Sequence, residues 1–293
     1  MIQRLRLLEG MIDYAGLFPP ASLSLTEAMG RYETYRTGED AWALGGFVLP
    51  AGRLEEFQRS ANRAPPKGRP WPLSITLPVD HGEGLAQVYA FRAADTSQSG
   101  IISLIEAKVR TPEMAQTLVD ATPAGVDLFL EVDLTDHTES LVQGVAGAGG
   151  FVKFRTGGVT PDAIPKPEHL LRGLEAVVAA GVPFKCTAGL HHPVRGSYPL
   201  TYEEGSTVAV MHGYLNVLLA AGFLMEGWRP ERALAVLLDS AAESFEMSAD
   251  RVAWRGESLA EGAIEHLRRG GLRSFGSCSF REPIDELALL PVS

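Results

Sequence analysis

The sequence predicts an α/β protein built as one (β/α)8 TIM barrel across residues 1–293, with an N-terminal helical extension and a helical insertion between strands 6 and 7. Two observations predict this fold. Short β-branched runs alternate with helical patterns, as is typical of parallel sheets, and eight such runs occur, the number that closes a barrel. No linker rich in Pro, Gly and Ser and no internal repeat divides the chain, so we expect a single domain.

Composition narrows the class of protein. Hydrophobic residues make up 45% of the chain and charged residues 21%, which is typical of a globular protein. The formal net charge of -10 argues against nucleic-acid binding, because phosphate backbones are held by clustered Lys and Arg. The only two cysteines, Cys186 and Cys278, and a charged N-terminus unlike a secretory signal predict a cytoplasmic protein. The apolar stretch 208–224 contains polar residues and predicts a buried helix, not a membrane span.

The elements are expected in the following order. Two helices, at residues 3–11 and 25–35, form the extension over residues 1–40. The eight strands are expected at residues 44–49, 73–77, 101–109, 126–134, 151–156, 182–188, 252–254 and 274–278.

One helix and the insertion are the clearest features between the strands. In residues 168–180, Leu170, Leu174 and Val177 share one helical face, and Gly181 ends the helix. Residues 191–250 contain a polar loop and two helices near 207–224 and 230–245, and these apolar helices make a homodimer plausible.

Two strands carry charges where buried parallel strands are normally apolar. The two-residue period places Lys153 and Arg155 on one face of their strand, and Lys185 and Thr187 on one face of the next. In a barrel this face is the interior, and sites lie at the carboxyl ends of the strands. The sequence therefore predicts a cavity into which all four side chains project.

Carboxylates occur on the two preceding strands. Glu106 lies on the third predicted strand, and Glu131 and Asp133 share a face of the fourth. One interpretation is a structural layer in which these groups neutralise the buried cations. The other is a functional site, which we favour because burying unpaired cations costs several kcal/mol and a fold gains little from three of them.

Small residues follow the charged strands. Thr156, Gly157 and Gly158 come after the fifth strand, and Gly189 after the sixth, where glycine permits close approach of the backbone to an anion. The last strand ends in a short run of small residues that could bind a phosphate or form an ordinary turn: Gly276, Ser277 and Ser279.

Histidines and one aromatic segment are further candidates. His191, His192 and His212 lie after the sixth strand, where one could approach a substrate, although adjacent histidines seldom bind one metal. The segment 12–20, with Tyr14, either closes one end of the barrel or reaches the site.

The order of these motifs resembles the deoxyribose-phosphate aldolase family of class I aldolases. That family has a Lys-Thr-Ser-Thr-Gly strand with the Schiff-base lysine, a Phe-Lys-x-x-Gly-Gly strand with a second lysine, and a final Phe-Gly-x-Ser-Ser strand that binds phosphate. This chain has Lys153-Phe154-Arg155-Thr156-Gly157, then Phe184-Lys185-Cys186-Thr187-Ala188-Gly189, then Phe275-Gly276-Ser277-Cys278-Ser279. Less than a third of the chain is covered. Arg155 replaces a small residue, and Glu106 stands in the neighbourhood of the family's acid/base aspartate.

The resemblance implies an aldolase-like lyase that needs no cofactor and no metal. Lys153 would form an imine with a small anionic metabolite, helped by the charge of Lys185 or Arg155, while Glu106 or Glu131 moves protons. Two alternatives stay open. Glu106, Glu131, Asp133 and a histidine could hold a divalent metal in a lyase or hydrolase, or the barrel could bind an anion without catalysis. No nucleic-acid or membrane partner is expected.

Overall fold

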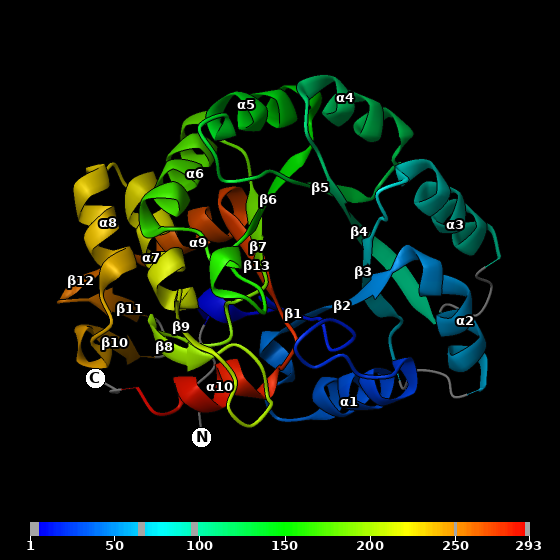
Figure 1. The fold of residues 1–293 in the computed structure, drawn as a ribbon, viewed down its shortest axis with the longest axis horizontal. Helices are drawn as coiled ribbons and strands as arrows, with labels where there is room; N and C mark the ends of the chain where they lie inside the picture. The colour runs from blue at the N-terminus through cyan, green and yellow to red at the C-terminus, as the bar shows by residue number, and fades with distance from the viewer. Residues whose placement is uncertain (1–5, 64–67, 95–98, 249–250, 291–293) are drawn as a thin grey trace.

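Eight parallel strands form a closed barrel in a computed structural model that describes residues 6–63, 68–94, 99–248 and 251–290. Around the barrel the strand order is β1-β13-β7-β6-β5-β4-β3-β2, and helices surround it on the outside (Figure 1). The predicted TIM barrel is therefore confirmed. The barrel strands are β1 (Ile12–Tyr14), β2 (Leu44–Pro50), β3 (Trp71–Thr76), β4 (Gly100–Lys108), β5 (Asp127–Glu131), β6 (Phe151–Arg155), β7 (Phe184–Thr187) and β13 (Leu272–Ser277).

Seven of the eight predicted strands belong to the barrel, and the eighth prediction is wrong. Residues 252–254 lie in β11 (Arg251–Trp254), which pairs antiparallel with β10 (Phe245–Ser248) and β12 (Glu257–Ser258) in a separate small sheet. The missing barrel strand is β1, which pairs parallel with β13 and β2. It has three residues with Asp13 at its centre, so it offers no apolar run to recognise.

The predicted N-terminal extension is therefore part of the barrel. α1 (Leu25–Thr37) is the helix of the first βα unit, and it begins at Ser24 with a capping box closed by Glu27. Of the helix predicted at residues 3–11, the first residues lie outside the described part. The rest contains only a 3-10 turn, η1 (Arg6–Leu8), before β1.

The next helices cover the outside of the barrel in chain order. They are α2 (Leu54–Arg63), α3 (His81–Ala94), α4 (Pro112–Ala121), α5 (Thr138–Ala148) and α6 (Pro167–Ala180). α6 matches the predicted helix, and Gly181 ends it in the left-handed conformation at φ 61°. Short 3-10 turns are η2 (Ala41–Ala43), η3 (Ala51–Arg53), η4 (Pro161–Ala163) and η5 (Ala242–Ser244).

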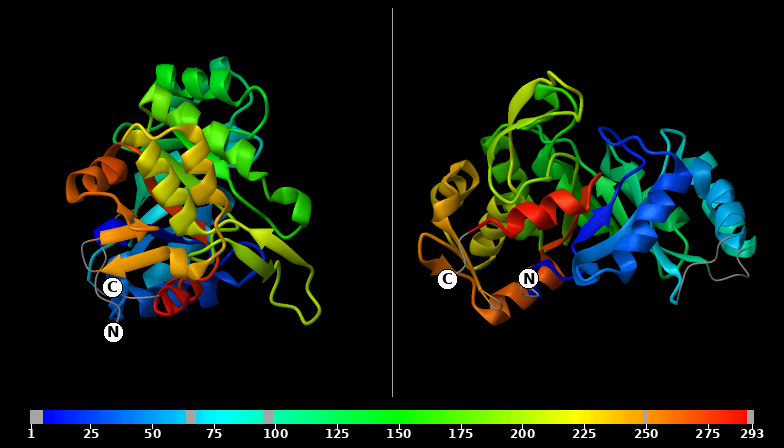
Figure 2. Two further views of the ribbon diagram at one scale, coloured as in Figure 1. Left: turned by 90° about the vertical axis from the view of Figure 1, so that its left-hand side faces the viewer. Right: turned by 90° about the horizontal axis from the view of Figure 1, so that it is seen from below.

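The insertion lies between the seventh and eighth barrel strands, β7 and β13, and not between the sixth and seventh as predicted, because β1 is an additional barrel strand. It contains two helices that are shorter than predicted, and residues 208–211 of the first predicted helix belong to a hairpin that was not predicted. The hairpin, β8 (Gly196–Pro199) and β9 (Val208–Met211), projects beyond the barrel (Figure 2). α7 (Tyr214–Met225) is buried along almost its whole length, and α8 (Pro230–Leu238) packs against it. α9 (Glu261–Gly270) leads to β13, and α10 (Arg281–Leu287) follows it.

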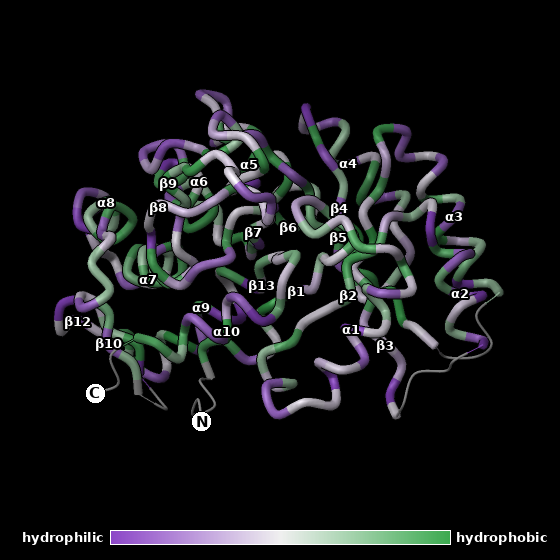
Figure 3. The backbone as a smooth tube through the Cα atoms, turned by 60° about the horizontal axis from the view of Figure 1, so that its bottom comes forward, coloured by the Kyte–Doolittle hydropathy of each residue, from purple (hydrophilic) through white to green (hydrophobic). Residues whose placement is uncertain are grey.

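Hydrophobic residues gather along the strands and α7, while many outer loops are hydrophilic (Figure 3). α7 is a core helix of the insertion, as its apolar sequence predicts. Among the described residues, no helix is both long enough and apolar enough to cross a membrane.

Candidate active site

A cavity of about 760 Å³ opens at the carboxyl ends of the barrel strands. The strand ends contribute Glu106, Glu131, Lys153, Arg155 and Thr187 to its wall. The loop after β1 and the tip of the β8–β9 hairpin complete the wall with Ala15, Phe18, Pro19, Pro20, Leu200, Thr201, Tyr202 and Glu203. The site therefore lies where a TIM barrel places its chemistry.

A chain of alternating charges forms the floor of this cavity. Lys185 Nζ lies 2.7 Å from Asp13 Oδ2 and 2.6 Å from Glu106 Oε1. The other oxygen of Glu106 lies 2.7 Å from Lys153 Nζ, which is also 2.9 Å from Glu131 Oε2. The two lysines are neighbours in the register of β6 and β7, so both face the barrel interior as the two-residue period predicts.

Lys185 is the inner member of this network. It is fully buried and does not line the cavity, so of the four predicted side chains only Lys153, Arg155 and Thr187 reach it. Burial alone would lower the pKa of Lys185, but the carboxylates of Asp13 and Glu106 outweigh it and raise that pKa above its usual range. Lys185 is therefore a fixed charge that holds Glu106 in place.

Hydroxyl and amide donors complete the inner layer. Ser74 donates to Glu106 Oε1 at 2.7 Å, Ser274 to Asp13 Oδ2 at 2.7 Å, and the backbone N–H of Gly46 to Asp13 Oδ1 at 2.8 Å. Burial opposes ionisation of Glu106, yet Lys153 and Lys185 hold its pKa well below the usual range. Glu106 therefore stays ionised, with Lys153, Lys185 and Ser74 as its donors.

Asp13 is the residue that the sequence reasoning missed. It is buried inside the barrel, while its neighbours Ile12 and Tyr14 are buried in the core. The two-residue period places Asp13 on the inward face, opposite Ile12 and Tyr14, once residues 12–14 are a strand. Tyr14 does not reach the cavity: its ring packs near Tyr32 and Tyr35 of α1, and its hydroxyl has no partner among the described residues.

Of the two buried lysines, Lys153 is the one that lines the cavity. Its side chain retains 7% of its accessible surface, and its ammonium group is held by Glu106 and Glu131. Burial opposes ionisation of Glu131, but Lys153 and Arg155 outweigh it and lower the pKa of that carboxyl. Lys185 and Arg155 are themselves paired with carboxylates, so repulsion between cations, the expected source of lysine activation, is offset.

Arg155 and Lys108 bring positive charge to the cavity wall. The Arg155 side chain is 52% exposed and has one described carboxylate contact, 3.4 Å from Nε to Glu131 Oε1. Asp133 does not join Glu131, because β5 ends at Glu131. Instead Asp133 lies at the surface, 2.8 Å from Lys108 Nζ.

The glycines after β6 and β7 lie where two backbones cross. A Cβ on Gly157 would lie 2.8 Å from the Gly189 Cα, and Gly189 has φ +77°. Thr156 ties the same loops together by donating to Ala188 O at 2.6 Å. Gly158 and Gly189 line the cavity, while Gly157 and Thr156 shape it from behind.

At the end of β13, one of the three predicted residues lines the cavity and two do not. Gly276 and Cys278 line the cavity, whereas Ser277 and Ser279 do not. The alternation of β13 explains the difference, because Ser274 also faces inward and Ser277 falls on the opposite side. Ser277 Oγ donates to Ser279 O at 2.6 Å, so its hydroxyl proton is used within the turn.

Two of the three histidines reach the cavity. His191 and His192 line it, 3.1 Å from Glu282 and 2.8 Å from Glu286. His212 lies elsewhere, 2.8 Å from Pro165 O, and burial lowers its pKa. The predicted metal-binding set of Glu106, Glu131, Asp133 and a histidine is not brought together, and no group of three or more His, Cys, Asp or Glu in the described ranges has an arrangement that could hold a metal ion.

No protein-family model, no curated protein and no solved structure matches this chain.

Proposed function

We propose that the protein is an aldolase-like lyase that acts on a small anionic carbonyl metabolite through a Schiff base at Lys153. The observation that supports it is the position of the Lys153 ammonium group, which faces the cavity between the carboxylates of Glu106 and Glu131. Lys185 lies behind it, sealed from the cavity. The motifs around these lysines resemble those of class I aldolases.

The carboxylates of Glu106 and Glu131 can accept the proton of Lys153 and stabilise the cation that forms in this reaction. Attack on a carbonyl requires the neutral amine, and Glu131, 2.9 Å from Nζ, is placed to accept the proton. Once Lys153 is neutral, its lowering effect on the Glu131 carboxyl disappears, and the acid holds the proton more readily. The iminium that forms after loss of water is again cationic, so Glu106 and Glu131 stabilise it as they stabilise the ammonium group.

The exposed guanidinium group of Arg155 favours an anionic substrate. More than half of its side chain is exposed, and it contacts one carboxylate among the described residues, which leaves guanidinium donors for a carboxylate or phosphate. Lys108 and Gly158 also line the cavity. The anionic group of the substrate would bind here, and the part that carries the carbonyl group would extend towards Lys153.

The purely structural alternative accounts for Lys185 better than for Lys153 and Arg155. A salt-bridge layer does exist between the strands. A layer serving stability alone would have no need of a cavity above it or of a half-exposed arginine at its rim. A non-catalytic anion receptor would use the same Arg155, and turnover separates it from the lyase.

Borohydride trapping tests the proposal. Incubation with a panel of small aldehydes and keto acids, followed by borohydride, should give a stable adduct that mass spectrometry locates on Lys153. Lys153→Ala should abolish the adduct, whereas Lys166→Ala, which removes an exposed lysine outside the cavity, should retain it. An adduct on Lys185 would reverse the two roles. No specific adduct with any carbonyl compound, in a protein shown by circular dichroism to be folded, would refute the Schiff base.

A further inference from the structure

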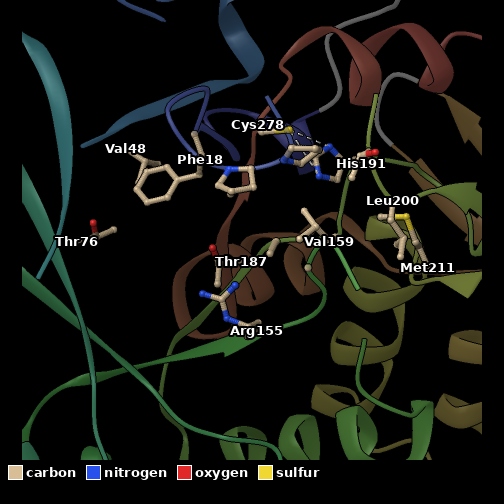
Figure 4. Close-up of a pocket in the computed structure, with 18 of the residues that line it drawn as sticks. Phe18, Val48, Thr76, Arg155, Val159, Thr187, His191, Leu200, Met211 and Cys278 are labelled. Carbon is tan, nitrogen blue, oxygen red and sulfur yellow. Dashed lines mark hydrogen bonds between the residues drawn. The ribbon is translucent and has the colours of Figure 1, made fainter. Parts of the chain in front are cut away.

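A second cluster of reactive side chains lies across the cavity from Arg155. It consists of Cys278 after β13, His191 after β7, Glu282 of α10 and Tyr202 of the hairpin loop, and all four line the cavity. Figure 4 shows Cys278 and His191 together on the side facing Arg155 and Thr187. The proposed reaction at Lys153 uses none of them.

The contacts within this cluster are those of an activated nucleophile. Cys278 Sγ lies 3.8 Å from Nδ1 and 3.9 Å from Nε2 of His191. Glu282 Oε2 lies 3.1 Å from Nδ1, and Sγ is the one hydrogen-bond partner of Nε2 among the residues that the structure describes. A thiol beside an imidazole that a carboxylate orients is the arrangement that turns a weak nucleophile into a strong one.

His191 is held in its charged form by its neighbours. Burial alone would lower the pKa of His191, but its contacts with Cys278 and Glu282 outweigh burial and raise that pKa to about 10. An imidazolium beside sulfur stabilises the thiolate. The Tyr202 hydroxyl donates to Glu282 at 3.0 Å and lies 3.4 Å from Sγ, so its one proton can be given to a charged sulfur only by turning away from Glu282.

The other cysteine provides an internal comparison. Cys186 lies on β7 between the inward-facing Lys185 and Thr187, so its side chain points to the helices and is fully buried. Burial raises the pKa of its thiol to about 12. A thiol reagent should therefore not reach Cys186 in the folded protein, and thiol labelling measures the reactivity of Cys278, which lines the cavity.

We propose that Cys278, activated by His191, is a second nucleophile of this cavity and adds reversibly to the carbonyl carbon of a small aldehyde. The pair reacts as thiolate and imidazolium, with the thiol proton already on His191: a bond forms between Sγ and carbon, and the C=O π pair moves to oxygen. That oxygen then takes the proton back from the imidazolium, which leaves a thiohemiacetal. The step needs no oxidant and no leaving group, and it is independent of an imine at Lys153.

Alkylation by iodoacetamide tests the activation. At pH 6.5 we expect Cys278 to react at least tenfold faster than glutathione, with Cys186 unlabelled, as read by peptide mass spectrometry. In His191→Gln the pH midpoint of the rate should rise towards the value of an ordinary thiol, about 8.5. Tyr202→Phe should shift the midpoint in the same direction by a smaller amount. Because Tyr202 is exposed, this variant tests the proposal if His191→Gln does not fold. A wild-type rate no greater than that of glutathione, or a profile unchanged in folded variants, overturns the proposal.

Protection by glycolaldehyde tests the carbonyl chemistry. The experiment is made in Lys153→Ala, so that an imine at that lysine cannot contribute. An excess of glycolaldehyde should slow alkylation of Cys278 severalfold, and dialysis should restore the rate. If the aldehyde gives no protection while the thiol is activated, the proposed addition is wrong. Because Lys153 is absent, this outcome is distinct from failure of the borohydride experiment.

Discussion

Lys185 shows how a fully buried cation is made tolerable. It contacts two carboxylates, and the same carboxylates accept hydrogen bonds from Ser74, Ser274 and a backbone amide. Glu106 links it to Lys153, because one oxygen serves each lysine. The inner lysine therefore positions the acid that the outer lysine contacts.

Removal of this inner charge should be costly. Lys185→Met leaves Asp13 buried without its cation and Glu106 with Lys153 as its one remaining cation, and we expect the free energy of unfolding to fall by about 3–5 kcal/mol. Lys108→Met removes a cation from a surface pair with Asp133 and should cost less than about 1 kcal/mol. Urea denaturation measures both.

A double variant provides the control for that prediction. Asp13→Asn removes the carboxylate charge that Lys185→Met leaves without a cation, so the double variant should lose less stability than the sum of the two single changes. Additive losses would show that the two side chains do not interact in solution.

At the scale of elements, the site depends on two loops that cross behind the cavity. The loops after β6 and β7 meet at Gly157 and Gly189, with backbone atoms too close for a side chain. Thr156 fastens them by donating to Ala188 O. The crossing lies directly after Arg155 and Thr187, the last residues of β6 and β7. It explains why both Gly157 and Gly189 are glycines, which an anion site alone would not require.

Gly189→Ala tests the crossing. The added methyl group would meet the Gly157 backbone at 2.8 Å and would also force a left-handed conformation on alanine. Gly125→Ala has the same left-handed strain, at φ +79°, with no atom within 4 Å of the new Cβ. Strain alone should cost roughly 1–2 kcal/mol in both variants, and Gly189→Ala should cost clearly more. Equal losses in thermal or urea unfolding would mean that the loops separate easily.

Over the whole molecule, the network makes stability depend on pH in a defined direction. The folded pKa values of Glu106 and Glu131 lie below the value of about 4.3 in an unfolded chain. Their contribution is therefore fully present above that pH, and it is lost as the pH falls through the folded values. Lys185 behaves in the opposite sense, because its raised pKa makes its contribution decline only at strongly alkaline pH.

Acid denaturation checks this sign. We expect the free energy of unfolding to fall as the pH is lowered from about 5 to 3, with net uptake of protons on unfolding. Glu131→Gln should show a smaller fall over the same window, because one titrating group with a lowered pKa is gone. A stability that is flat from about pH 5 to pH 3 in the wild-type protein would contradict the ionised network.

The sequence by itself determined the barrel, seven of its strands and the inward direction of both lysines. Each of these follows from a local period: apolar runs mark buried strands, and alternate residues face opposite sides. The same period failed at β1, where three residues around Asp13 give too short a pattern to distinguish from a loop. At the last strand the period favours Gly276 and Cys278, which line the cavity, over Ser277 and Ser279.

Tertiary structure alone decided which charges meet. Asp13 and Lys185 are far apart in the chain, and they pair only because closing the barrel brings β1 and β7 to either side of β13. The carboxylate between the lysines, the meeting of Cys278 with His191, and the separation of Asp133 from Glu131 are equally long-range results. A sequence period fixes the face on which a side chain lies, but distances across a barrel depend on strand order and register, which no local pattern encodes.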